Sequence, residues 1–69
     1  MIAEVYWFTD NDMVTVFDEH GHQMPDYSGH HFAVAGHVLR DAPLTAKFYR
    51  ADLAVGSKER ITRKDFTER

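Results

Sequence analysis

The chain contains no cysteine among its 69 residues, so neither disulfide bonds nor thiolate-ligated zinc can stabilise its fold. No apolar run approaches the roughly 20 residues that cross a bilayer. The amino-terminal segment has neither the basic stretch nor the long apolar stretch of a signal peptide. We therefore expect one small cytoplasmic domain, residues 1–69, with no membrane contact and no cofactor.

Lysine and arginine are absent from residues 1–39, where every side chain that is charged at neutral pH is acidic, whereas basic residues outnumber acidic ones in residues 40–69. The net charge of the whole chain is −3. Two interpretations are open. The two halves attract each other within one fold, or the first half presents an acidic face to a basic partner.

Two segments near the amino terminus have the alternating pattern of β-strands. Residues 2–8 and 13–18 are rich in aromatic and β-branched types. The turn residues "TDND" between them predict a β-hairpin in which Phe8 lies opposite Met13. A short third strand over residues 22–24 is expected to follow a second turn.

A helical pattern follows around residues 30–40. Asp26 or Ser28 is placed to cap its first turn, and Pro43 ends it. His31 is expected to be half-buried beside the apolar stripe of this helix. The stripe, which we expect to pack on the sheet, consists of Phe32, Ala35, Val38, Leu39 and Ala42.

The last third of the chain completes the expected fold. Residues 45–53 have a strand pattern, and residues 59–62 could form a last short strand. Thr62 and Asp65 have the spacing of a capping box, which predicts a closing helical turn that returns Phe66 to the body. The elements predict an α+β fold, in which a small antiparallel sheet of three to five strands, opening with an N-terminal β-hairpin, is packed on one side by a single helix.

The two faces of the predicted hairpin have different compositions. One face is wholly apolar and suits the helix; it consists of Ala3, Val5, Trp7, Val14 and Val16. The other face is too aromatic for ordinary solvent-exposed surface. It consists of Ile2, Glu4, Tyr6, Phe8, Met13, Thr15 and Phe17. Since one helix covers only one side of a sheet, the C-terminal segment with Phe66, a second copy or a different protein should cover this second face.

Aromatic surface on a small domain is typical of a protein-binding site. We therefore predict a non-enzymatic interaction or modulator module that binds another protein or a second copy of itself. Its predicted contact residues are Tyr6, Phe8, Met13, Thr15 and Phe17. Small, acidic, aromatic-rich domains are common among accessory and phage-encoded proteins that modulate a larger protein. Catalysis is not expected, because so short a chain rarely encloses a pocket and shows neither a nucleophile–base arrangement nor a phosphate-binding glycine loop.

The five histidines suggest an alternative, a metal-binding or metal-responsive domain. His20 and His22 would share one face of a strand and could ligate one ion, although Gly21 between them favours a turn. A third ligand would have to come from a histidine of the helix. A response to pH and an ordinary solvated surface are the other interpretations of these side chains.

Weak nucleic-acid binding is a further alternative, based on the basic C-terminal segment. Acidic residues are interleaved with its cations, so its net positive charge is small and we do not expect nucleic acid to be the main partner. The cations are Lys58, Arg60, Arg63, Lys64 and Arg69.

Overall fold

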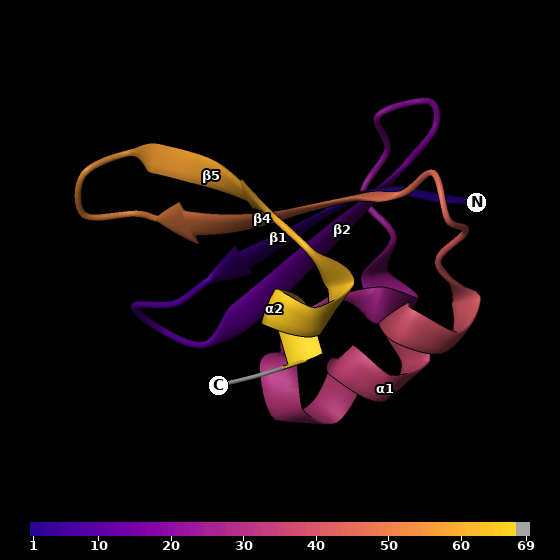
Figure 1. Cartoon of the computed structure of the whole chain (residues 1–69), viewed down its shortest axis with the longest axis horizontal. Coiled ribbons are helices and arrows are strands. Elements are labelled where there is room, and N and C mark those ends of the chain that lie inside the picture. The colour runs from indigo at the N-terminus through magenta and orange to yellow at the C-terminus, as the bar shows by residue number, and fades with distance from the viewer. Residues whose placement is uncertain (68–69) are drawn as a thin grey trace.

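The computed structural model describes residues 1–67 as a five-stranded sheet with both helices on one side (Figure 1). The strand order is β3-β2-β1-β4-β5. The predicted α+β fold is confirmed. The strands are β1 (Ile2–Phe8), β2 (Met13–Asp18), β3 (Gly29–His30), β4 (Lys47–Asp52) and β5 (Ser57–Ile61), and the helical elements are η1 (Pro25–Tyr27), α1 (His31–Asp41) and α2 (Arg63–Thr67).

The N-terminal hairpin forms in the predicted register, with Phe8 opposite Met13. Its turn is closed by side chains on both sides: Trp7 donates its indole N–H to Oδ1 of Asp12 at 3.0 Å, and Oδ1 of Asn11 accepts the N–H of Met13 at 3.2 Å. Asp12 has a φ of 59°, a left-handed conformation that aspartate tolerates better than most residues. Local turn chemistry therefore fixes the register of β1 and β2.

The sheet is mixed, so the expectation of a wholly antiparallel sheet was wrong at one pair. β4 lies parallel to β1, whereas the other pairs are antiparallel. Parallel neighbours need a crossover connection, and α1 provides it by carrying the chain beneath the sheet between β2 and β4. The predicted strand over residues 22–24 is reduced to one bridge between Phe17 and Gln23, and Gly29–His30 pairs with β2 instead.

Ile2 was expected on the second face of the hairpin, but a β-bulge at the start of β1 places it elsewhere. The register shifts between Ile2 and Glu4, so that the strand alternation is interrupted at Ala3. Ile2 is consequently 2% exposed and belongs to the core rather than to the second face.

The hydrophobic core lies between the sheet and the helices. The predicted capping box is confirmed, because Thr62 and Asp65 exchange side-chain-to-backbone hydrogen bonds of 3.1 and 3.2 Å. This cap begins α2 and brings the fully buried Phe66 against Trp7 and Phe48. The core cluster consists of Ile2, Val5, Trp7, Val14, Val16, Val34, Val38, Ala42, Ala46, Phe48, Ile61 and Phe66.

The predicted stripe of helix α1 is confirmed except at Phe32, because Val38 and Ala42 belong to the core and Ala35 and Leu39 pack against it. Phe32 is 73% exposed, and the buried positions in the first turns are His31 and Val34. The predicted cap was also wrong, because Ser28 Oγ instead accepts the N–H of Val16 and donates to the carbonyl of Met24. No helix formed by residues 1–67 has the length and apolar character needed to span a membrane.

Candidate protein-binding face

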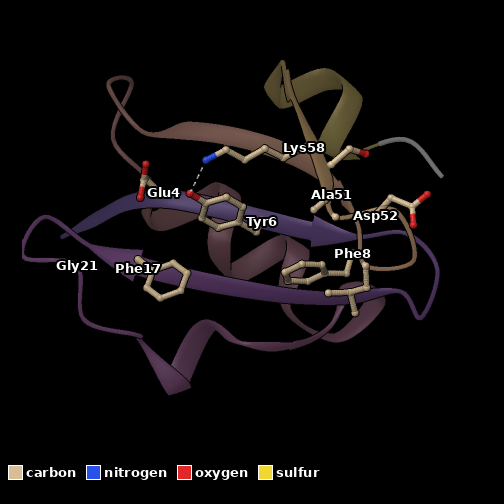
Figure 2. A pocket seen from close by; sticks show the side chains of 11 residues that line it. Glu4, Tyr6, Phe8, Phe17, Gly21, Ala51, Asp52 and Lys58 are labelled. Carbon is tan, nitrogen blue, oxygen red and sulfur yellow. Dashed lines mark hydrogen bonds between the residues drawn. The ribbon is translucent and has the colours of Figure 1, made fainter.

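The five predicted contact residues lie on one face of the sheet, opposite the helices. In the β1–β2 ladder, Tyr6 is the partner of Thr15 and Phe8 the partner of Met13. Strand alternation turns these side chains away from the core, and Figure 2 shows the rings of Tyr6, Phe8 and Phe17 on the strands with α1 behind. All five side chains are half-buried.

Strands β4 and β5 extend this surface beyond the hairpin. Tyr49 is the register partner of Tyr6, and Ala51 that of Phe8. Lys58 and Arg60 on β5 pair in turn with Ala51 and Tyr49. We call this surface the aromatic face; it consists of Tyr6, Phe8, Met13, Thr15, Phe17, Tyr49 and Ala51, with the cations Lys47, Lys58 and Arg60 along its β4–β5 side and Glu4 on β1 beside Lys47.

Contacts between neighbouring rings explain why the aromatic face is half-buried although no helix formed by residues 1–67 covers it. Tyr6 and Tyr49 stack with ring centroids 5.0 Å apart and an interplanar angle of 13°. On its other side Tyr6 meets Phe17 edge to face at 5.6 Å. Such cross-strand aromatic pairs stabilise the sheet and form a ridge across its middle.

A groove of about 560 Å³ runs beside this ridge. Phe8, the small side chain of Ala51 and Asp52 line one end, and Phe17 with Gly21 lines the other (Figure 2). Leu53 of the β4–β5 turn is also part of the lining. The loop after β2 extends away from the helices and borders the aromatic face (Figure 1). Leu53 is 58% exposed, so the apolar surface continues from the groove onto the β4–β5 turn.

The groove is lined by the charged residues Glu4, Asp52 and Lys58, and two cations of the aromatic face lie beside the stacked tyrosines. Nζ of Lys58 lies 5.2 Å from the ring centre of Tyr6 and 4.9 Å from that of Tyr49, and it donates to the Tyr6 hydroxyl at 3.4 Å. Arg60 lies 5.9 Å from the ring centre of Tyr49. These are cation–π distances, so the rings hold both cations on the aromatic face.

His20 and His22 lie in the exposed loop after β2, with ring centroids 6.3 Å apart. Asp18 organises this loop, because its Oδ1 accepts the backbone N–H groups of His22 and His20, each at 2.9 Å. Those hydrogen bonds hold the pKa of Asp18 below its ordinary value. Within residues 1–67 no three histidine or carboxylate side chains are grouped so that they could hold a metal ion, so the pair has no third protein ligand there.

The basic C-terminal residues do not share one environment. Lys58 lies over the aromatic face, whereas Arg63 donates to the carbonyl oxygens of Ala42 and Pro43 at 2.7 and 2.5 Å. Arg63, Arg60 and Lys64 border a second hollow, on the β5–α2 side of the molecule. Arg69 lies outside the described residues.

Sequence reasoning missed Tyr49, Ala51 and Leu53 as parts of the face. The alternation of β4 could have placed Tyr49 opposite the buried Phe48, but only the parallel pairing with β1 brings it against Tyr6. Comparisons of the chain with protein-family models, curated proteins and solved structures find no match.

Proposed function

We propose that the protein is a non-enzymatic interaction module of the cytoplasm that binds another protein through its aromatic face. The observation that supports this proposal best is the position of Phe66. This ring, together with α1, packs on the opposite side of the sheet, so α2 does not cover Tyr6, Phe8 and Phe17.

The composition of the face also favours a protein partner. Tyrosine, phenylalanine and methionine are enriched in protein interfaces, and buried aromatic anchors contribute much of their binding energy. The groove offers room for a side chain of the partner beside Phe8 and Tyr6. Leu53 adds exposed apolar surface at its rim.

Two face variants and one matched control test the proposal. Phe8→Ala and Phe17→Ala each remove one half-buried ring from the face, whereas Leu44→Ala removes a side chain that is 93% exposed and lies elsewhere. Circular dichroism and thermal unfolding establish that each variant folds. Quantitative affinity capture then compares the proteins retained by the wild type and by the three variants.

We expect the retained partner to be lost with Phe8→Ala and Phe17→Ala and kept with Leu44→Ala. Equal retention by all folded variants would contradict the proposal, as would unfolding of both face variants, because the face would then be part of the core. Light scattering on the untagged protein tests whether the partner is a second copy of the chain. A dimer dissociated by Phe8→Ala would mean that a second copy occupies the face.

A further inference from the structure

The loop after β2 carries two exposed imidazoles on a turn that is closed by hydrogen bonds. Oδ1 of Asp18 accepts the backbone N–H groups of His20 and His22, each at 2.9 Å. The N–H of Asp18 donates to the carbonyl oxygen of His22 at 2.9 Å, and the N–H of Gly21 donates to the carbonyl oxygen of Asp18 at 3.1 Å. Gly21 has a φ of 82°, which few residues with a side chain adopt. These contacts fix the backbone from which both imidazoles project.

The distance between the two rings is close to that of a pair that shares one metal ion. The ring centroids of His20 and His22 are 6.3 Å apart, and the ring planes are inclined at 43°. Two imidazoles on one tetrahedral zinc ion, with Zn–N bonds of about 2.0 Å, have their ring centres roughly 5–5.5 Å apart. Both side chains are exposed, so rotation about their side-chain bonds closes a difference of about 1 Å. The pair is therefore one half of a tetrahedral site.

The neighbouring carboxylates support the pair rather than complete it. Nδ1 of His22 lies 4.0 Å from Oδ2 of Asp18, so the neutral ring favours its proton on Nδ1 and Nε2 becomes the metal-binding nitrogen. Oε1 of Glu19 accepts the N-terminal ammonium of Met1 at 3.1 Å. Within residues 1–67 no third histidine or carboxylate joins the two imidazoles to form a metal-binding group. Two positions of a tetrahedral ion are thus left for ligands from another molecule.

A second copy of the chain is the molecule that best supplies those two ligands. The loop extends away from the helices (Figure 1), so two such loops can meet at their tips. A two-fold axis through the ion gives it four equivalent imidazoles, which is the ligand number of a closed zinc site. In residues 1–39, which include the loop, every side chain charged at neutral pH is acidic. Two copies of this region repel each other until a divalent cation lies between them, so their association should require the metal.

We propose that two copies of the chain bind one zinc ion between them, with His20 and His22 of each copy as its four ligands. The site is incomplete in a single copy. Asp18 is a positioning residue, because it fixes the loop backbone and orients the ring of His22. This proposal goes beyond the binding of a partner through the aromatic face and does not rest on it.

Light scattering during a zinc titration of the untagged, chelator-treated protein tests the proposal. The mass should double and reach its plateau near one zinc ion per two chains, and EDTA should reverse the change. Cobalt(II) provides a second readout, because a tetrahedral Co²⁺ ion absorbs visible light much more strongly than a six-coordinate one. In NMR spectra of the labelled protein, the ring signals of His20 and His22 should be the ones that zinc shifts.

Variants of the loop locate the site. His20→Ala and His22→Ala each leave one imidazole per copy and should raise the zinc concentration at half-maximal change in mass by at least about tenfold. Asp18→Asn keeps the oxygen that accepts the loop amides but removes the charge behind His22, so it should weaken zinc binding by about tenfold. As a matched control, His30→Ala with His37→Ala removes two exposed imidazoles outside the loop and should leave binding nearly unchanged. Circular dichroism establishes that each variant folds.

Several results would overturn the proposal. An unchanged mass with one zinc ion bound per chain would mean that water, rather than a second copy, completes the coordination of the metal. Equal zinc binding by the wild type and by His20→Ala with His22→Ala, or equal loss in the control variant, would indicate an adventitious ion only. Phe8→Ala should double its mass with zinc as the wild type does. Loss of the doubling in this variant would mean that the copies meet through the aromatic face instead.

Discussion

His31 and Phe66 are joined by a buried hydrogen bond, in which Nε2 of His31 donates to the carbonyl oxygen of Phe66 at 2.6 Å. The acceptor is a carbonyl, so the proton of this bond resides on Nε2. The imidazole also stacks on Trp7 at 4.1 Å between ring centres and is 3% exposed. One side chain therefore ties the start of α1 to α2 and to the central strand.

Replacing this imidazole should destabilise the fold substantially. His31→Ala removes the hydrogen bond to Phe66 and leaves a cavity against Trp7, which we expect to lower the free energy of unfolding by about 2–4 kcal/mol. Urea unfolding followed by the fluorescence of Trp7, the single tryptophan, measures the change. His37→Ala on the exposed side of the same helix should stay within about 0.5 kcal/mol of wild type, and an equal loss in both variants would contradict the assigned role.

The buried role of His31 shows where sequence periodicity failed. The predicted stripe wrongly included Phe32 and passed over His31, because histidine is scored as polar, whereas its other members do lie in or against the core. The partners of the imidazole, Trp7 and the backbone of Phe66, come from distant parts of the chain. By contrast, local signals predicted the hairpin register, the helix around residues 30–40 and the cap at Thr62 correctly.

Loss of the cap at Thr62 should weaken the attachment of α2. Thr62→Ala removes the Oγ1 acceptor of the Asp65 N–H, and we expect a loss of about 1 kcal/mol in the free energy of unfolding. Thr62→Ser retains an acceptor at the same position and should recover most of this loss. The same urea experiment compares the variants. A serine variant as unstable as the alanine variant would show that packing of the threonine methyl, rather than the cap, stabilises α2.

Two glycines should respond to alanine in opposite directions. Gly36 lies on the exposed side of α1 with open space at its Cβ position, so Gly36→Ala should raise the free energy of unfolding by about 0.5–1 kcal/mol. Gly29 has a φ of 149°, and an added Cβ would lie 3.4 Å from Cγ1 of Val34. Gly29→Ala should therefore lower stability by about 1–3 kcal/mol. Thermal unfolding of the two variants side by side checks the sign of each change, and stabilisation by both would show that β3 is not held at this φ.

The candidate face was predictable only in part. The composition of β1 and β2 was sufficient to place Tyr6, Phe8, Met13, Thr15 and Phe17 together, because strand alternation and turn length are local properties. The bulge that moves Ile2 into the core was not predicted from the sequence of residues 2–4. The charge of the face was missed for a different reason: Lys58 and Arg60 reach it only through the pairing of β4 with β1, a contact between segments more than 40 positions apart.

Acid should selectively weaken the connection between α1 and η1. Oδ2 of Asp41 accepts the Tyr27 hydroxyl at 2.5 Å, and Oδ1 accepts the guanidinium of Arg40 at 3.0 Å. The hydrogen bonds from Arg40 and then Tyr27 lower the pKa of Asp41 from 3.8 to about 2. The folded state thus favours the ionised carboxyl, so this contribution to stability is complete above the unfolded pKa and is lost as pH falls through the folded pKa.

The variant Asp41→Asn isolates this contribution. Its melting temperature should lie below that of the wild type at neutral pH, and the difference should shrink as pH falls from about 5 toward 2, where the wild-type carboxyl is itself protonated. Tyr27→Phe removes one of the two partners and leaves Arg40, so it should reduce the pH-dependent part without abolishing it. Thermal unfolding at a series of pH values measures all three proteins. A difference between wild type and Asp41→Asn that stays constant down to the lowest pH would mean that the loss comes from packing of Asp41 rather than from its charge.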